Sequence, residues 1–447
     1  MSSSINLPKT RAFLYGGDVE IDGFWVEKGL IPLGSLYPPY KYKNKDEYPN
    51  GIPICIDGFC NNSKKENHVV TIPFEIPDGR SFTSMDQFNL LILGGSGDGK
   101  GMLTKVIWAV MAEAGYKVCY IDAKGREAAR ATKSWKSPNL PPFTKPKGIP
   151  LAHFMPHFSL ARVDKNILHN FRLYSQDLST MDSAELWMSI GMQSQGASFV
   201  ARVIRDANNV GDEVNLHYLQ EEIKEATEDD LSDPSKGNVN RILSDVYAWE
   251  LIKPRSKVLN LYNEWQKKNS IVISFNMLQD KRWMIFDIGY LIKEASTYFD
   301  KYGIIKPILF IFDDASKYLR KVEGVNINIA MSEVTSIGND GRSKGINSIL
   351  EVQSLGLIDE DVAESYKTII ISPYFKKPDS LKNINIPQEA IDLLRNGSLI
   401  MNKETKPPII QWILITRDGK IVPFFPFTPG CNHFTNIDLP KQEVAEC

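Results

Sequence analysis

The residues with the clearest chemical role form a glycine-rich loop. It reads Gly94, Gly95, Ser96, Gly97, Asp98, Gly99, Lys100 and Gly101, and Met102 follows it. In a Gly-x4-Gly-Lys loop the glycines let backbone N–H groups turn toward a phosphate, and the lysine reaches the β- and γ-phosphates. Any α/β protein can contain a glycine-rich turn, but an apolar run before this loop and a helical pattern after it favour phosphate binding. The loop therefore predicts a site for a nucleoside triphosphate.

The position after the loop lysine departs from the usual pattern. Ser or Thr normally stands there and holds Mg²⁺ through its hydroxyl, whereas this chain has Gly101. Water, or Thr104 further along the helix, would have to replace that ligand. Because Mg²⁺ normally keeps several waters, the loss is compatible with metal binding. It is equally compatible with weak hydrolysis.

An acidic pair follows a second apolar run. Asp313 and Asp314 come directly after residues 308–312, which have the composition of a buried strand. A carboxylate at the carboxyl end of such a strand can hold a magnesium-bound water, and a second can polarise the attacking water. We assign the first role to Asp313 and the second to Asp314. The alternative is that both cap a helix over residues 315–321.

The elements that position these residues alternate along the chain. We expect strands at 89–93, 117–122, 270–275, 307–312, 346–352 and 368–372, which together complete a mostly parallel sheet. Helices are expected at 184–207 and 216–226, with a polar connection at 229–238. This predicts an α/β fold with a RecA-like P-loop NTPase core. We place a small β-rich N-terminal module at 1–85, the core at 86–180 and 266–425, a helical insertion at 181–265 and a C-terminal tail at 426–447.

The order of the motifs resembles the HerA–FtsK superfamily of hexameric DNA-pumping ATPases, and within it the HerA-like branch. The resemblance covers residues 85–425, with the helical insertion between the second and third core strands. The segments that carry it are 94–101, 121–127, 313–315, 341–346, 351–354 and a late strand at 396–400. It implies ATP and Mg²⁺ as cofactors. Asp314 stands where the superfamily usually has Glu, and together with Gly101 this shorter carboxylate predicts a slow ATPase.

Further roles follow from the same resemblance. Gln353 would sense the γ-phosphate or the attacking water. Arg342 would reach the nucleotide of a neighbouring subunit as an arginine finger, with Arg126, Arg320 and Arg395 as competitors. The resemblance implies a homo-hexameric ring around double-stranded DNA. Its implied partners are a nuclease, a portal or a transfer protein of a plasmid or virus.

The basic stretch 128–147 is a candidate for gripping DNA phosphates, and a solvated surface loop is its alternative. The function predicted in this way is an ATP-driven double-stranded DNA translocase. The alternative is a nucleotide-binding assembly scaffold or coupling protein with weak or no hydrolysis.

The composition limits the class of protein. The chain has 447 residues, 43% of them hydrophobic, and a formal net charge of −2. These values exclude a globally basic nucleic-acid binder, although a local basic groove stays compatible with them. No apolar run approaches the roughly 20 residues of a membrane-spanning helix. The first residues lack the basic and apolar regions of a secretory signal, so we expect no membrane span and a cytoplasmic location.

Overall fold

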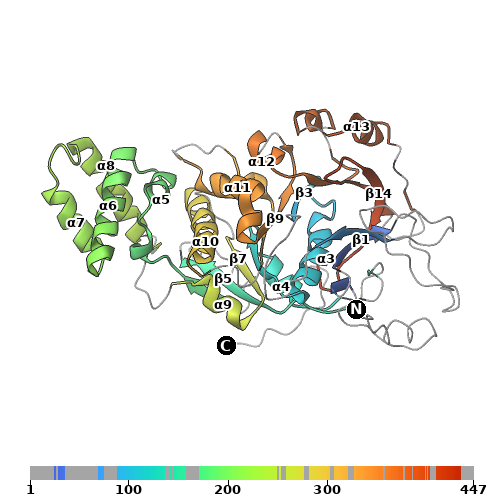
Figure 1. Ribbon diagram of the computed structural model, residues 1–447, viewed down its shortest axis with the longest axis horizontal. Coiled ribbons are helices and arrows are strands. Elements are labelled where there is room, and N and C mark those ends of the chain that lie inside the picture. Colours follow the sequence, from blue (N-terminus) through green and yellow to red (C-terminus); the bar gives the residue numbers. More distant parts are fainter. Residues whose placement is uncertain are drawn as a thin grey trace, which may run out of the picture. The chain divides into compact units, whose positions relative to one another are not determined.

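A computed structural model of the chain describes most residues from 88 onward and short segments before them (Figure 1). The described residues are 25–26, 29–35, 69–74, 88–135, 140–141, 144–157, 171–248, 251–252, 258–275, 281–302, 307–320, 327–355, 358–375, 378–384, 386–397, 399, 401–402 and 409–433. They form two compact units. The first unit comprises Met1–Tyr116, Arg130–Ile149 and Tyr366–Cys447, and the second comprises Lys117–Ala129 and Pro150–Ser365. Most of the predicted module 1–85 lies outside the described residues.

The first unit is built on a sheet of mixed direction. In spatial order its strands are β2 (Val69–Pro73), β1 (Leu30–Ser35), β14 (Ile421–Pro426), β13 (Trp412–Ile415), β10 (Thr368–Ile371) and β3 (Asn89–Leu93). β3 and β10 pair in parallel, and the other neighbours pair antiparallel. β3 is fully buried, as its uninterrupted apolar sequence requires. Helix α3 (Lys100–Glu113) follows β3 and packs against β1.

The C-terminal part of the first unit adds short elements. They are η8 (Pro378–Ile384), α13 (Gln388–Arg395) and the two-stranded sheet of β11 (Met401–Asn402) and β12 (Ile409–Ile410). The late strand predicted at 396–400 is wrong at its start, because α13 ends in a turn at Asn396 and Gly397. Ser398 and Ile400 lie outside the described residues. Gly397 has a φ of 61°, which favours glycine after a helix.

The second unit is built on parallel strands. In spatial order they are β9 (Ile346–Val352), β8 (Ile308–Phe312), β4 (Lys117–Asp122), β7 (Ser270–Ser274), β5 (Leu151–Pro156) and β6 (Arg172–Tyr174). Its further helices are α4 (Glu127–Ala131, reaching into the first unit), α9 (Leu261–Lys267), α10 (Lys281–Tyr302), η5 (Ala315–Lys317), α11 (Ile329–Asp340), η6 (Gly341–Lys344) and α12 (Glu360–Glu364). The carboxyl ends of β4, β8 and β9 therefore lie at one edge of this sheet.

A group of helices separates β6 from β7 in the chain. They are η3 (Leu178–Thr180), α5 (Ala184–Ser189), α6 (Ser194–Val210), α7 (Leu216–Glu225) and α8 (Asp233–Ala248). Within the second unit α6, α7 and α8 pack on one another, while α5 contacts α10 and α11 (Figure 1). The single helix predicted at 184–207 is wrong, because Gly191 adopts a φ of 98° and ends the first segment. The polar stretch 229–238 is partly helical, since α8 begins at Asp233.

The six predicted strands are confirmed, with ends that differ by one residue at most. The expectation that these six complete the sheet is wrong, because β13 and β14 add to the strands of the first unit, and β5 and β6 add to those of the second. Two strands of the 1–85 stretch also belong to a larger sheet, since β1 pairs with β14. In the 426–447 stretch, Phe427, Cys431 and Asn432 are buried. None of the helices in the described part of the chain is long and apolar enough to cross a membrane.

Candidate nucleotide-binding site

The phosphate loop lies between β3 and α3 in the first unit. Gly97 and Gly99 have φ values of 88° and 98°, a left-handed backbone that glycine adopts without a steric cost. Gly99 is the N-cap of the 14-residue helix α3, so the loop ends at the positive end of a helix dipole. Ser96 and Gly97 are exposed to solvent. The loop therefore presents backbone N–H groups at a place where a phosphate has access.

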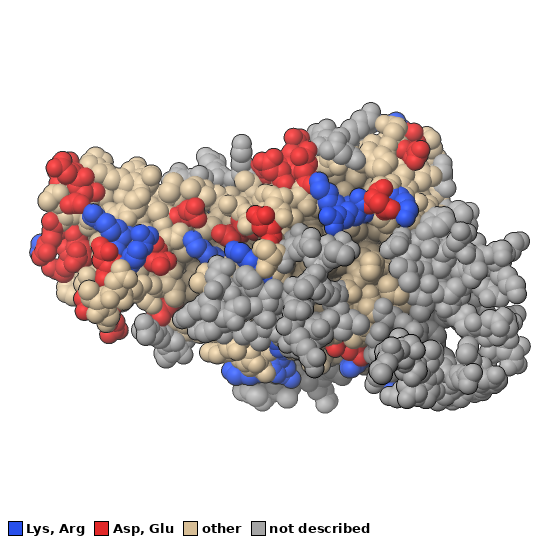
Figure 2. All heavy atoms as spheres, viewed as in Figure 1, with Lys and Arg blue, Asp and Glu red and all other residues tan. Residues whose placement is uncertain are grey.

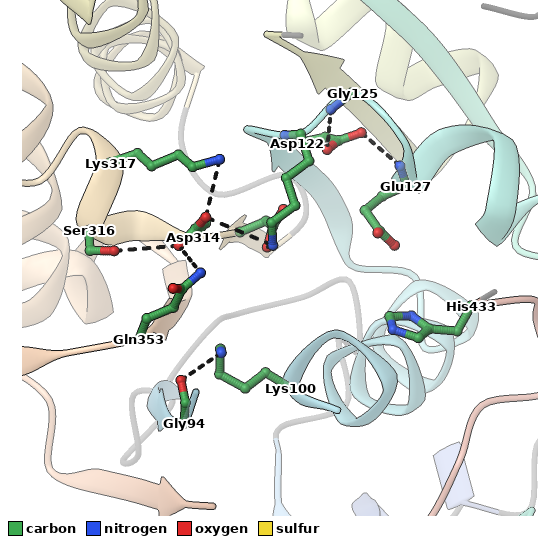
Figure 3. A network of polar contacts seen from close by, with 12 residues as sticks. Gly94, Lys100, Asp122, Gly125, Glu127, Asp314, Ser316, Lys317, Gln353 and His433 are labelled. Atoms are coloured by element: carbon green, nitrogen blue, oxygen red, sulfur yellow. Dashed lines mark hydrogen bonds and ion pairs between the residues drawn. The ribbon is translucent and has the colours of Figure 1, made fainter. Parts of the chain in front are cut away.

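The side chain of Lys100 turns back along the loop. Lys100 is buried, and its Nζ donates hydrogen bonds to the carbonyls of Gly94 and Gly95, each at 2.7 Å (Figure 3). Asp98 braces the same loop, because its Oδ2 accepts from the N–H of Gly95 and from Ser372 Oγ at 2.7 Å. Ser372 directly follows β10, so the carboxylate links the loop to a neighbouring strand.

Thr104 is the candidate to replace the hydroxyl that Gly101 lacks. It is fully buried within α3, and its Oγ1 has no hydrogen-bond partner among the described residues. The neighbouring Lys105 is also fully buried. Its Nζ donates to the carbonyl of Asn432 at 3.1 Å and lies 3.2 Å from His433 Nδ1.

A second set of polar residues belongs to the second unit and begins at the end of β4. The Oδ1 of buried Asp122 accepts from the N–H groups of Lys124 at 3.0 Å and Gly125 at 2.7 Å, and its Oδ2 accepts from Glu127 N at 2.8 Å (Figure 3). Ser274 Oγ at the end of β7 donates to Asp122 Oδ2 at 3.1 Å. The carboxylate thus fixes the turn that carries Lys124.

The acidic pair lies at the end of β8, within the same unit. Asp313 Oδ1 accepts from Lys124 Nζ at 2.9 Å. Asp314 Oδ1 accepts from Gln353 Nε2 at 2.8 Å, and its Oδ2 lies 3.2 Å from Lys317 Nζ (Figure 3). Gln353 therefore lies beside the acidic pair, as expected. Both aspartates are almost fully buried.

The capping alternative for the acidic pair is not what the structure shows. Only residues 315–317 form a short 3₁₀-helix, and the side chain of Asp314 at its N-cap makes no capping hydrogen bond. Asp314 has a φ of 53°, and it is the one non-glycine residue with positive φ in the described part of the chain. Such backbone conformations cost free energy and cluster at functional sites.

Burial and neighbouring charge perturb this set of groups. Burial, and then the nearby carboxylate of Glu351, raise the pKa of Asp313 well above its ordinary value, although Lys124 acts in the opposite direction. Burial and Glu127 raise the pKa of Asp122, against the three backbone N–H donors. Burial alone would lower the pKa of Lys124, but its hydrogen bond to Asp313 and the charges of Asp313, Glu351 and Asp314 together raise it. The buried carboxyl groups of Asp122 and Asp313 therefore bind a proton more tightly than exposed ones do.

Asp313 fits a magnesium ion on two observations. Its Oδ2 is buried and has no hydrogen-bond partner among the described residues. Its carboxylate is also the hard oxygen ligand that Mg²⁺ prefers. No group of three His, Cys, Asp or Glu within the described ranges is arranged to hold a metal by itself. An ion at Asp313 would accordingly take its remaining ligands from water and phosphate, as Mg²⁺ commonly does.

The predicted residues thus fall into two sets. The loop residues 94–102 and Thr104 belong to the first unit, whereas Asp313, Asp314, Gln353 and Arg342 belong to the second. Arg342 lies in η6, but its side chain is outside the described residues. Sequence reasoning gave no role to Lys124, Lys317 or Ser372. Lys124 lies two residues after Asp122, and Lys317 lies three residues after Asp314, and this spacing was the signal that could have indicated both lysines. The sequence around Ser372 contains no such signal.

The chain has a RecA-like P-loop NTPase fold, as the sequence predicted. Its Gly-x4-Gly-Lys loop joins a strand to a helix, and its carboxylate pair follows a buried parallel strand. No protein-family model and no curated protein sequence matches the chain. Among solved structures it is similar to VirB4 of Thermoanaerobacter pseudethanolicus, with a TM-score of 0.51 and 11% identity, over 80% of this chain and 93% of that one. This similarity confirms the fold that the sequence predicted.

Two further solved structures are similar at lower scores. The bacterial conjugative coupling protein TrwBdeltaN70 with sulphate has a TM-score of 0.42 and 11% identity, over 75% of this chain and 78% of that one. The genome packaging NTPase B204 from Sulfolobus turreted icosahedral virus 2 with sulfate has a TM-score of 0.36 and 11% identity, over 77% of this chain and 98% of that one.

Proposed function

We propose that this protein is a cytoplasmic, ATP-driven double-stranded DNA translocase that works as a homo-hexameric ring. The observation that carries the proposal is the hydrogen bond from Gln353 to Asp314 beside Asp313. The order of motifs assigns these three residues to one hydrolytic centre. We assign the protein to DNA packaging, transfer or end processing for a plasmid or virus, with a nuclease, portal or transfer protein as partner.

In this proposal each set of residues has its own task in ATP hydrolysis. The N–H groups of the loop and Lys100 hold the phosphates of ATP. Asp313 would serve the Mg²⁺ ion, which would supply charge neutralisation at the phosphates. Asp314 accepts the proton of the attacking water, and Gln353 orients that carboxylate through its amide. Arg342 reaches the nucleotide of the adjacent subunit.

The grip on DNA is assigned to the basic stretch 128–147. Of its cations, Lys133 and Lys147 are exposed, and Lys136 lies outside the described residues. The stretch is held in place by the backbone of 430–432: Trp135 N and Lys147 N both donate to the carbonyl of Gly430, at 2.7 and 2.9 Å. Exposed cations on an anchored loop suit contacts to phosphates, which are independent of base sequence.

The helical insertion does not suit that role. Residues 184–248 contain 12 Asp and Glu against five Lys and Arg, a net charge of −7. Figure 2 shows acidic side chains gathered over the helices α6 to α8. A surface of this sign repels a DNA backbone, so we assign the insertion to contacts with protein.

The test is ATP hydrolysis by the purified protein with and without double-stranded DNA. We expect DNA to stimulate hydrolysis and Lys100→Ala to abolish it, while Lys224→Ala, which changes an exposed lysine of α7, leaves it unchanged. Rings of six in electron micrographs with nucleotide and DNA are the expected assembly. The absence of any hydrolysis with DNA and magnesium would refute the motor.

A second candidate is an assembly scaffold or coupling protein that binds ATP but hydrolyses it weakly or not at all. Two observations favour it: Gly101 has no hydroxyl, and Thr104 is buried. For such a protein Lys100→Ala abolishes nucleotide-dependent assembly, and DNA leaves hydrolysis unchanged. The same ATPase assay therefore separates the two functions.

A further inference from the structure

Lys124 occupies the solvent side of the Asp313 carboxylate. Its Nζ lies 2.9 Å from Asp313 Oδ1 and 3.9 Å from Asp314 Oδ2. The side chain of Asp313 is 5% exposed, whereas that of Lys124 is 41% exposed. The ammonium of the more exposed lysine therefore contacts one oxygen of a carboxylate that is itself almost fully buried.

Several carboxylates lie near Asp313. The charges of Asp122, Glu127 and Glu351 act on it, and Asp314 follows it in the chain. Among the described ion pairs, the ammonium groups of Lys124 and Lys317 contact the acidic pair. A cation beside a buried carboxylate favours its charged form.

The backbone of Lys124 is fixed, but its side chain can leave. The N–H groups of Lys124 and Gly125 are both held by Asp122 Oδ1, and Gly125 supplies the left-handed turn with a φ of 70°. Asp122 is held in turn by Ser274. The four methylene groups of the lysine have no such restraint, and its ammonium contacts Asp313 at the end of a flexible stem. Releasing Asp313 requires rotation of this side chain and no movement of the turn.

We propose that Lys124 is the resident counter-ion of Asp313 in the metal-free protein, and that it is displaced from this carboxylate when a divalent cation binds. The inference deepens the proposed function, since it takes Asp313 as the carboxylate that serves the metal. An ammonium and a hydrated divalent cation compete for the negative charge of the same carboxylate. Lys124 therefore sets how tightly the site takes its metal, and it keeps the buried carboxylate paired in the empty state.

The direct test measures Mn²⁺ binding to the full chain without nucleotide, by electron paramagnetic resonance. Lys124→Met keeps the length of the side chain and removes its charge. An opposite charge at this distance changes a carboxylate's proton affinity by about tenfold or more, and we expect Mn²⁺ affinity to rise by about tenfold. Lys317→Met is the matched control, because Lys317 contacts Asp314 but not Asp313 in the described ion pairs. It should change the affinity by less than about threefold, as should Lys124→Arg, which keeps the charge.

An affinity of Lys124→Met that is no higher than that of Lys317→Met would overturn the proposal. So would a lack of Mn²⁺ binding by every variant. A second measurement does not depend on the folding of Lys124→Met. Lysines of the wild-type protein are dimethylated with ¹³C, and the signal of Lys124 is assigned by its loss in Lys124→Arg. Added Mg²⁺ should move this signal to the position of a free lysine, and a signal that stays in place contradicts displacement.

These results are independent of the proposed function. DNA-stimulated hydrolysis with unchanged Mn²⁺ affinity in Lys124→Met would refute the role of Lys124 alone. A tenfold rise in Mn²⁺ affinity without any hydrolysis would refute the motor and leave the counter-ion in place.

Discussion

The buried carboxyl of Asp287 makes the stability of the protein depend on pH. Asp287 lies in α10 and is fully buried, where it accepts hydrogen bonds from the hydroxyl of Tyr174 and the amide of Gln176. Burial raises the pKa of Asp287 from 3.8 to about 7, although both hydrogen bonds act in the opposite direction. In the unfolded chain the group ionises near its ordinary pKa.

The higher pKa of Asp287 in the folded state means that its contribution to stability falls as the pH rises. Because the folded state binds the proton more tightly, the contribution of Asp287 to stability is complete below about pH 4. It decreases as the pH rises toward 7 and is constant above that value. A difference of about three pKa units corresponds to a loss of about 4 kcal/mol in the free energy of unfolding. In urea this is a shift in midpoint of about 1 M.

Asp287→Asn removes this dependence. The amide is neutral at every pH, and its NH₂ group can donate to Tyr174 as a protonated carboxyl would. We therefore expect the variant to gain about 4 kcal/mol relative to the wild type between pH 4 and pH 8. Urea unfolding followed by fluorescence, with Trp283 buried in the same helix, measures it at each pH. Asp229→Asn, at an exposed position in the insertion, is the control. Parallel pH profiles of the wild type and Asp287→Asn would refute the reasoning.

Three further predictions concern the nucleotide site. Asp98→Asn keeps a hydrogen-bonding group beside Ser372 but removes a negative charge from the phosphate loop. It should therefore tighten ADP binding about tenfold, as measured by calorimetry, and unchanged or weaker binding would contradict this. Gly101→Ser should raise magnesium-dependent turnover several-fold, and no change in rate or metal dependence would mean that another group already holds the ion. Gln353→Leu removes the donor to Asp314 and should lower kcat about 10²-fold with little effect on nucleotide affinity; a loss confined to affinity would place Gln353 in binding instead.

The fold was predictable where the strands are continuous and apolar. β3, β4, β7, β8 and β9 are buried almost throughout, and such runs are recognisable in sequence. β5 was missed because His153 and Pro156 interrupt its apolar run, and pairing with β7 decides its conformation instead. The helix break at Gly191 was missed because the apolar spacing continues on both sides of it.

The site was predictable only in its separate parts. Gly94 to Lys100 and Asp313 stand out by local spacing. The order of motifs gave Gln353 a role at the nucleotide, but not its hydrogen bond to Asp314. The pairing of Lys124 with Asp313 joins residues 189 positions apart, so it depends on the neighbouring register of β4 and β8. The burial of Thr104 depends on how α3 packs, which spacing along one helix does not fix.

The buried Lys105 limits where the protein can be truncated at its C-terminal end. Its ammonium reaches the carbonyl of Asn432 across 327 positions of sequence, and it lies in the helix that begins at the phosphate loop. A fragment that stops before Asn432 deprives a buried charge of this acceptor, which typically costs a few kcal/mol. The shortest expressible version of the ATP-binding unit therefore extends through His433, and an affinity tag belongs beyond that residue.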